Sequence, residues 1–298
     1  ARPGAGLNVS DAGGPLSSWG GTVTRGDDGL YHLFVSQFVS HCGFNQWDSN
    51  SRVVHAVSPE ADGRYEVQQV VWPVLAHNPA VTRGPKGEWI MTFVSNSSGS
   101  EYEATCEGGV VTKNSSLASP VLQHNFMSWA TSPYGPWSEP VSIDAPFDAA
   151  VPPFLLQGQP DRNTNLVMTI AADGSMTGLW RRCCSPPPQY QPPGGGGESV
   201  LFAVHATRWD DVSTWRAGKT KLLPGLTANG YEDPHVWPDP RKSGPGGHRV
   251  LHAVFHSMQD GWHRPEFDNT RVGAHAFSDD GGASWVSTGP AFGLSVAY

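Results

Sequence analysis

Hydrophobic and polar residues alternate along most of this chain, in short segments separated by turns. The stretch "TVTRGDDGLYHLFVSQF" at 22–38 has two alternating runs joined by an Asp-Gly turn, and "AVTRGPKGEWIMTFVS" at 80–95 repeats the arrangement around Lys-Gly. A period of two residues is typical of β-strands with one buried face, and glycine turns between such runs predict hairpins. We therefore expect an all-β protein with no helix longer than a turn or two.

These hairpins belong to a weak internal repeat, in which an alternating strand is followed by a strand that ends in Ala-x-Ser. The repeat recurs four times, starting near residues 22, 80, 154 and 235. Each copy has enough alternating segments for a blade of short antiparallel strands, the unit of a β-propeller. We predict a single propeller domain over 1–298, with the Pro- and Gly-rich segment 183–199 as an exposed insertion.

The number of blades is left open by the repeat itself. After four full copies only "TGPAFGLSVAY" remains, which is an awkward count for a closed ring. Either the first and last segments complete a fifth blade together, or a segment beyond Tyr298 or a second chain supplies it.

The last copy contains the stretch "SDDGGASW" at 278–285, which fits the Asp-box pattern S-x-D-x-G-x-[ST]-W. We expect Asp280 to brace this hairpin and Trp285 to pack between blades. The motif is structural, so it supports the fold and says little about chemistry.

Composition narrows the range of partners. Glycine (35) and proline (26) are frequent, as a protein with many turns requires, and the net charge of -8 comes without a basic cluster. This excludes the electrostatic footprint of a nucleic-acid binder, and the lack of any run of about 18 apolar residues excludes a membrane span. The 12 tryptophans belong mostly in the core, but aromatic faces also stack on sugar rings, so neutral carbohydrates suit this composition.

Several features indicate a secreted protein. The chain starts at Ala1, as expected after removal of a signal peptide or trimming, and N-glycosylation sequons begin at Asn8, Asn96 and Asn114. The four cysteines lack metal-site spacing, which favours two disulfides over free buried thiols. Because adjacent cysteines form a strained pair, we expect Cys183 and Cys184 to bond to Cys42 and Cys106.

Together the motifs "SRVVHAVS", "AHNPAVTR", "ATSPYGPW", "YEDPHVW" and "GAHAFSDDGGASW" resemble the five-bladed propellers related to glycoside hydrolase families 43, 32 and 117. The resemblance covers nearly the whole chain, and it implies a five-bladed β-propeller of four-stranded antiparallel blades. In such enzymes the first strand of a blade carries an acid-Pro signature and projects its carboxylate into a central funnel. Hydrolysis then needs two carboxyls, one protonated and one ionised.

This resemblance places Glu232 where family 43 has its general acid, with Asp233 beside it. The other blades depart from the signature, because the second has His77 and Asn78, the third only a displaced Asp148, and the first Trp19 and Gly20. The missing base would have to come from Asp11, Asp48 or Asp148. Adjacent residues of a strand face opposite sides, so we expect only one of the two neighbouring acids to reach the funnel.

Histidines are the other candidates for the site. A histidine can act as a general acid near neutral pH, and family 117 is thought to use one where its relatives have an acid. Several histidines with Asp233 could instead hold calcium, zinc or manganese on the propeller axis, although hydrolysis requires no cofactor. Each histidine alone could equally be a hydrogen-bonded turn residue. The candidates lie on or beside predicted strand ends: His55, His77, His235, His252, His256 and His275.

The sequence thus predicts a secreted glycoside hydrolase acting on an oligosaccharide or polysaccharide, with Glu232 as proton donor. Candidate catalytic residues are Glu232, Asp233, His77 and Asp148, and candidate substrate-binding residues are Trp19, Trp47, Asp48, Asn78, His55, His235, His256 and His275. The broken acid pattern leaves a second hypothesis, a carbohydrate-binding propeller without catalysis. A sialidase is disfavoured, because the arginines show no pattern that would hold a substrate carboxylate.

Overall fold

The computed structural model describes residues 6–8, 10–11, 14–47, 49–96, 105–107, 110–113, 123–150, 155–156, 159–160, 162–183, 199–222, 231–258 and 271–292. The chain divides into two compact units, Ala1–Ser142 (unit 1) and Ile143–Tyr298 (unit 2). Strands dominate both units, as predicted, and the one α-helix in the described part of the chain is α1 (Ala145–Ala150). No helix within the described residues is long and apolar enough to cross a membrane.

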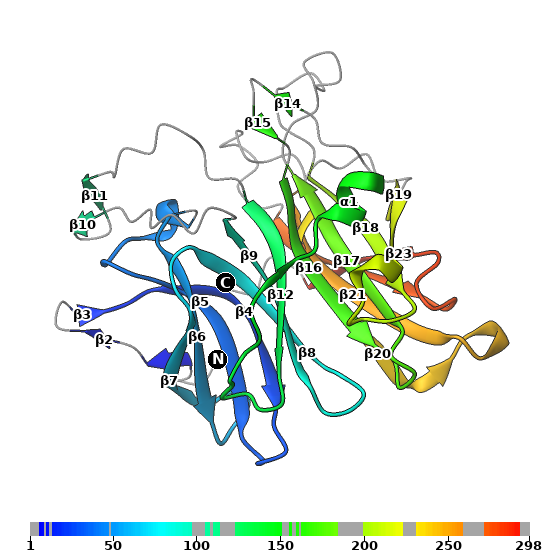
Figure 1. Cartoon of the computed structure of the whole chain (residues 1–298), viewed down its shortest axis with the longest axis horizontal. Coiled ribbons are helices and arrows are strands. Elements are labelled where there is room, and N and C mark those ends of the chain that lie inside the picture. Colours follow the sequence, from blue (N-terminus) through cyan, green and yellow to red (C-terminus); the bar gives the residue numbers. More distant parts are fainter. Residues whose placement is uncertain are drawn as a thin grey trace. The chain divides into compact units, whose positions relative to one another are not determined.

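Unit 1 contains two antiparallel sheets and two small hairpins (Figure 1). The first sheet consists of β4 (Ser18–Arg25), β5 (Tyr31–Phe38), β6 (Ser51–Ser58) and β7 (Arg64–Trp72), and the second of β8 (Ala76–Arg83), β9 (Trp89–Asn96), β12 (Gln123–Ala130) and β13 (Val141–Ser142). The hairpins are β2 (Ser10–Asp11) with β3 (Gly14–Pro15), and β10 (Thr105–Glu107) with β11 (Val110–Lys113). Apolar side chains from both sheets, among them Phe34, Val53, Trp89 and Met91, form one buried cluster.

Unit 2 also contains two four-stranded antiparallel sheets. One consists of β16 (Arg162–Ile170), β17 (Met176–Cys183), β18 (Ser199–Ala206) and β19 (Trp215–Lys221), and the other of β20 (Tyr231–Ser243), β21 (Arg249–Met258), β22 (Arg271–Ser278) and β23 (Val286–Phe292). A small hairpin, β14 (Leu155–Leu156) with β15 (Gln159–Pro160), follows α1. Phe147 of α1 stacks on Trp180, which stacks in turn on Phe202, and these rings anchor the helix to the sheet.

The described residues thus form four sheets of this kind, where five blades were predicted. In the described part of the N-terminal segment, β1 (Gly6–Asn8) pairs in parallel with β7 and extends the first sheet at its outer edge. The predicted insertion is bracketed by paired strands: Cys183 at the end of β17 lies opposite Ser199 at the start of β18. Residues 184–198 between them lie outside the described part.

A bulge interrupts the first strand of every one of these four sheets. The ladder shifts register between Trp19 and Gly21, His77 and Ala80, Thr164 and Val167, and Glu232 and His235. At each shift one residue has a left-handed backbone: Gly20 (φ 51°), Asn78 (50°), Asn165 (55°) and Asp233 (48°). Glycine, asparagine and aspartate are the residues that tolerate this conformation, so four different local sequences specify the same break.

The hairpin at 278–285 is closed by side chains. The Asp280 carboxylate accepts hydrogen bonds from the Ser278 hydroxyl (2.7 Å) and from the backbone N–H of Ser284 (2.9 Å). The Trp285 indole donates to the carbonyl of Gly282 (3.1 Å) and is 9 % exposed. Although partial burial acts to raise the pKa of Asp280, the hydrogen bonds from Ser284 and Ser278 hold it at about 2.

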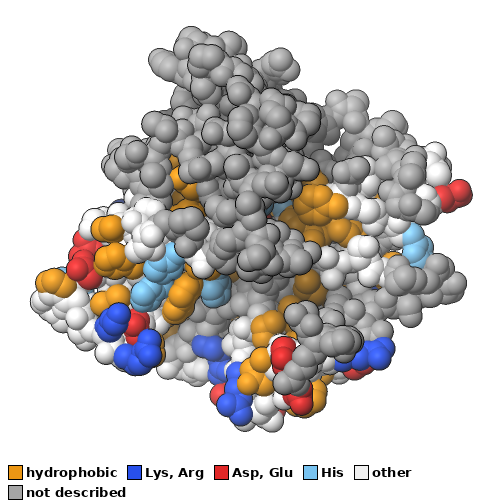
Figure 2. All heavy atoms as spheres, turned by 180° about the vertical axis from the view of Figure 1, so that it is seen from behind, with side chains coloured by type: hydrophobic (Ala, Val, Ile, Leu, Met, Phe, Trp, Pro, Cys, Tyr) orange, Lys and Arg blue, Asp and Glu red, His pale blue; other side chains and the backbone are white. Residues whose placement is uncertain are grey.

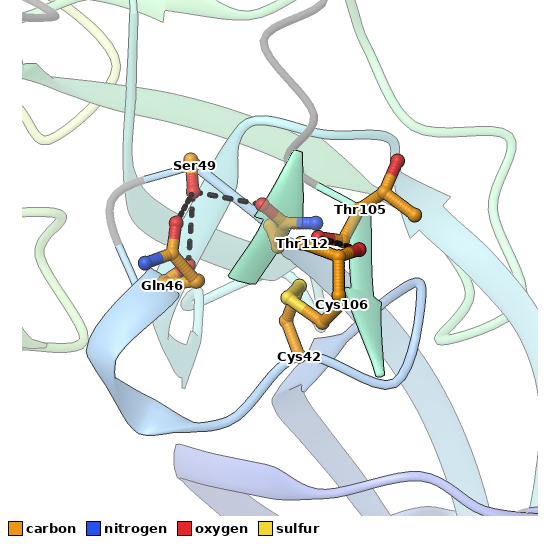
Figure 3. Close-up of a disulfide and its surroundings, with 7 residues drawn as sticks. Cys42, Gln46, Ser49, Thr105, Cys106 and Thr112 are labelled. Carbon is orange, nitrogen blue, oxygen red and sulfur yellow. Dashed lines mark hydrogen bonds between the residues drawn. A yellow bond between two sulfur atoms is a disulfide. The ribbon is translucent and has the colours of Figure 1, made fainter. Parts of the chain in front are cut away.

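The disulfide of unit 1 differs from the predicted pairing, because Cys42 bonds to Cys106 (Figure 3). It links the loop after β5 to strand β10, 64 positions further along the chain. Spacing in the sequence gave no information on this pairing, which depends on where the β10–β11 hairpin lies. The side chains of Cys183 and Cys184 lie outside the described residues.

The loop that carries Cys42 is held by further hydrogen bonds. The Ser49 hydroxyl lies between two amide side chains, 3.0 Å from Gln46 Oε1 and 2.7 Å from Asn50 Oδ1 (Figure 3).

The surface view shows small groups of basic and acidic side chains interspersed with histidine and hydrophobic ones (Figure 2).

Candidate active site

Two carboxyls and an imidazole come together in unit 2. Glu232 and Asp233 lie on β20 and His256 on the neighbouring strand β21. Each offers a donor atom, and these atoms all lie within 4.8 Å of one another. In the part of the chain that the structure describes, this is the one cluster of three or more such side chains.

The bulge in β20 explains how two adjacent acids can share this cluster. In a regular strand their side chains would face opposite sides, which was the reason for expecting only one at the site. The left-handed backbone of Asp233 and the register shift between Glu232 and His235 break that alternation. The assumption of an unbroken strand behind that expectation therefore does not hold.

Glu232 contacts two nitrogen-bearing side chains. Its Oε2 lies 3.1 Å from Nη2 of Arg181 on β17, and its Oε1 lies 3.2 Å from Nδ1 of His256. The side chains of Arg181 and Glu232 are 14 % and 16 % exposed, so water screens this ion pair only in part. An arginine at this distance favours the charged form of a carboxyl.

Asp233 is in a different environment. Its Oδ1 accepts a hydrogen bond from the amide of Asn165 on β16, which is buried at 6 % exposure, whereas the Asp233 side chain itself keeps solvent access. Desolvation by the surrounding protein raises the pKa of Asp233, the charge of Glu232 raises it further, and Arg181 and His256 oppose both effects. The site therefore combines an ion-paired carboxylate with a carboxyl that retains its proton to higher pH than usual.

The donor atoms in this cluster include the carboxylate and imidazole types that bind zinc or calcium. Arg181, however, already brings a positive charge to Glu232, so the cluster has an internal counterion. The predicted divalent cation remains a prediction.

Asp148, the predicted acid of the third repeat, lies in α1 and not on a strand. Its Oδ1 accepts a hydrogen bond from the Asn163 amide at 2.7 Å. The position in β16 that matches Glu232 and Asp233 is Thr164 and Asn165, where the bulge occurs. The third repeat therefore presents no acid at the signature position, and a catalytic role for Asp148 stays a prediction.

In unit 1 the matching positions of β4 and β8 gather aromatic side chains. The Trp19 ring stacks on His77 at 5.4 Å between centroids, and Trp47 packs edge-on against both. The His77 Nδ1 lies 3.1 Å from Asn78 Oδ1, and the Asn78 backbone N–H donates to the Ser36 hydroxyl at 2.9 Å. His77 is 2 % exposed and its ring packs against Trp19, and its catalytic role stays a prediction.

One aromatic side chain of this group was not predicted from the sequence. Phe44, in the disulfide-linked loop, packs edge-on against Trp19 and is 58 % exposed. Nothing in the alternation of residues singles it out, since the loop has no strand pattern. Trp19 and Trp47 are half-buried and Phe44 is exposed, so each of the three retains surface on which a ligand could stack.

The remaining candidate histidines are not part of the carboxyl cluster. His55 is fully buried and bonded to His32, which does not support a role in binding substrate. His235 stacks on Trp237, and His275 is bonded to His252 (3.0 Å) and to the Thr288 hydroxyl (2.6 Å). Asp48 and Asn114, and the side chains of Asp11, Asn8 and Asn96, lie outside the described residues.

Sequence reasoning missed two residues of the cluster, Arg181 and Asn165. Arg181 was considered only as a partner for a substrate carboxylate, and its contact with Glu232 depends on the packing of β17 beside β20. For Asn165 a signal was present in the tripeptides "TNL", "HNP" and "EDP". In each of them the middle residue, Asn or Asp, tolerates left-handed backbone and is followed by Leu or Pro. That pattern could have aligned the third repeat correctly.

No protein-family model matches this sequence, and no curated protein is significantly similar to it. Solved structures do resemble the chain. An endo-arabinase from Bacteroides thetaiotaomicron has a TM-score of 0.56 at 11 % identity, over 85 % of this chain and 75 % of its own. A family 117 glycoside hydrolase of Zobellia galactanivorans has a TM-score of 0.56 at 12 % identity, over 96 % and 73 %.

The catalytic domain of a GH62 α-L-arabinofuranosidase from Coprinopsis cinerea has a TM-score of 0.52 at 10 % identity, over 94 % of this chain and 70 % of that domain. At such identities the likeness shows the fold and not the activity. The described residues form four four-stranded antiparallel sheets. With these sheets, the protein has the all-β propeller fold of the glycoside hydrolases named above.

Proposed function

We propose that this protein is a glycoside hydrolase that cleaves a neutral oligosaccharide or polysaccharide, with Glu232 and Asp233 as its two carboxyls. The observation that carries the proposal is that a bulge brings both acids into one cluster and gives them different partners. Pairs of carboxyls whose surroundings push their protonation apart are typical of acid–base sites. The structural neighbours include an arabinase and an arabinofuranosidase, which supports carbohydrate as the substrate class.

In this proposal Asp233 and Glu232 have different roles in catalysis. Asp233, whose pKa is raised, protonates the departing glycosidic oxygen while Glu232, paired with Arg181, attacks the anomeric carbon, so the C–O bond breaks as a glycosyl ester forms. A water that gives its proton to the Asp233 carboxylate then hydrolyses this ester and frees Glu232. This reverses the assignment expected from the sequence, in which Glu232 was the proton donor.

No cofactor is required in this reaction, because Arg181 supplies the positive charge beside Glu232. The Cys42–Cys106 disulfide is typical of an oxidising compartment, and we propose that the protein acts outside the cell. Trp47 and Phe44 are proposed as stacking residues for sugar rings.

The test is to measure release of reducing sugar from arabinans, galactans and xylans by the wild type and by Glu232→Gln and Asp233→Asn. Each substitution should lower kcat by at least about 100-fold, the contribution of an acid or base group, with little change in Tm. Asp210→Asn, at an exposed ion pair with Arg208, is the matched control and should keep full activity. If either acid variant retains wild-type kcat, its catalytic assignment is wrong.

A carbohydrate-binding protein without catalysis is the second candidate. It is favoured by the residues preceding the bulge in the other three sheets, Trp19, His77 and Thr164, none of which is an acid. A sugar array would then show binding that survives in Glu232→Gln, without turnover of any bound sugar.

A further inference from the structure

Asn165 and Asp233 are matching positions of two neighbouring strands. β16 and β20 lie side by side in unit 2, and each is interrupted by a bulge whose left-handed residue is Asn165 in one and Asp233 in the other. The two residues meet through a hydrogen bond from the Asn165 amide to Asp233 Oδ1. The contact therefore joins two sheets at the points where the hydrogen-bond ladders of their first strands, β16 and β20, shift register.

The two partners differ in exposure. Asn165 is 6 % exposed, so its side chain is fixed by the packing around it, whereas Asp233 keeps solvent access. A buried side chain with few accessible rotamers is a rigid anchor for an exposed one. The amide thus determines the direction in which the Asp233 carboxyl points.

We propose that Asn165 is a positioning residue of the active site, holding the Asp233 carboxyl beside Glu232. The inference rests on the proposed function, and it adds that the acid pair is assembled by two sheets rather than by β20 alone. The left-handed backbone of Asp233 allows its side chain to leave the opposite face of the strand. The hydrogen bond from β16 then selects the one orientation that brings the two acids together.

The first experiment removes the Asn165 side chain and keeps the left-handed backbone conformation at that position. Glycine adopts the left-handed conformation without strain, so Asn165→Gly should preserve the bulge and lower Tm by only about 2–4 °C. A crystal structure of the variant should show the Asp233 carboxyl turned away from Glu232. With a cleaved substrate, kcat should fall at least about tenfold while KM stays within about twofold, as expected when a group acts in the transition state.

The second experiment exchanges the two side chains, in the double variant Asn165→Asp with Asp233→Asn. Both residue types tolerate left-handed backbone, and the amide–carboxylate hydrogen bond can form in the reverse direction. The Tm should therefore return close to that of the wild type, whereas activity should stay lost because the carboxyl has moved to β16. If the Tm of the exchanged variant instead stays as low as the two single substitutions together predict, the two side chains are not paired and the inference fails.

The outcomes separate this inference from the proposed function. If Asn165→Gly leaves both the Asp233 orientation and kcat unchanged, Asn165 does not position Asp233, and the hydrolase proposal stands. If no wild-type activity is found on any substrate while the carboxyl still turns away in the Asn165→Gly crystal structure, the positioning holds and the hydrolase proposal fails. Activity in the exchanged variant would overturn the assignment of Asp233 as proton donor, and this inference with it, because no carboxyl would remain at position 233 of β20.

Discussion

The side chain of His55 shows how strongly burial in a propeller sheet can alter a single residue. It lies in the core of unit 1, with its ring stacked on Phe34 at 4.6 Å, and its Nε2 is 2.9 Å from Nδ1 of His32. His32 in turn contacts the Asp28 carboxylate at 3.1 Å. Burial, and then the nearby His32, lower the pKa of His55 to about 4, although Asp28 acts in the opposite direction.

This shift predicts a loss of stability in mild acid. The unfolded chain protonates His55 below about pH 6.5, whereas the folded protein does so only near pH 4, so protons favour unfolding between these values. The contribution of His55 is fully present above pH 6.5, and between pH 7 and pH 5 it should fall by about 2 kcal/mol. Urea unfolding of the wild type and of His55→Phe at both pH values measures it: the variant should show the weaker pH dependence, and equal dependence would contradict the assignment.

At the scale of elements, the bulge in each first strand changes the direction of the side chains there, and in β20 it brings Glu232 and Asp233 together. Strand alternation in the sequence predicted β4, β8 and β20 and placed His77 and Glu232 at their starts, but it could not predict a register shift. Such a shift depends on the backbone angles of one residue, and Asn or Asp inside a strand is only a weak sign of it. For this reason the sequence offered only the displaced Asp148 in the third repeat, where Asn165 occupies the matching position, and treated Glu232 and Asp233 as facing opposite ways.

The backbone requirement at these bulges can be tested in unit 1 at Gly20. Its φ of 51° disfavours a branched side chain, whereas Asn and Asp occupy the same conformation in the other three sheets. Gly20→Val should therefore lower the free energy of unfolding by roughly 1–2 kcal/mol. Gly20→Asn is the control and should cost much less; chemical denaturation of both variants would refute the requirement if their losses were equal.

At the scale of the whole molecule, the repeat correctly predicted four-stranded antiparallel sheets, of which the described residues form four where five blades were expected. The sequence contains four copies, and the fifth blade was inferred from ring closure and from a resemblance to five-bladed propellers. The cysteine pairing failed for a similar reason. Contacts between residues far apart in the chain, such as Cys42 with Cys106, follow from the placement of loops that carry no periodic pattern.

The disulfide should stabilise unit 1 appreciably. It closes a loop of 64 residues, and the loss of freedom this imposes on the unfolded chain corresponds to about 4 kcal/mol in the chain-entropy model. The double variant Cys42→Ser with Cys106→Ser should thus lose about 2–4 kcal/mol, because measured effects are often smaller than this model gives. Differential scanning calorimetry would detect the loss, and the reduced wild type should behave like the variant; an unchanged transition would show that the bond adds no stability.

The short parallel strand β1 protects the protein against association. Gly6, Leu7 and Asn8 pair with Arg64, Tyr65 and Glu66, so part of the outermost strand of the first sheet is already covered. Deleting residues 1–8 would uncover backbone N–H and C=O groups along β7, and such a bare edge invites pairing with another molecule. We expect the shortened protein to form dimers or larger species as its concentration rises, which static light scattering would reveal, while the full chain stays monodisperse.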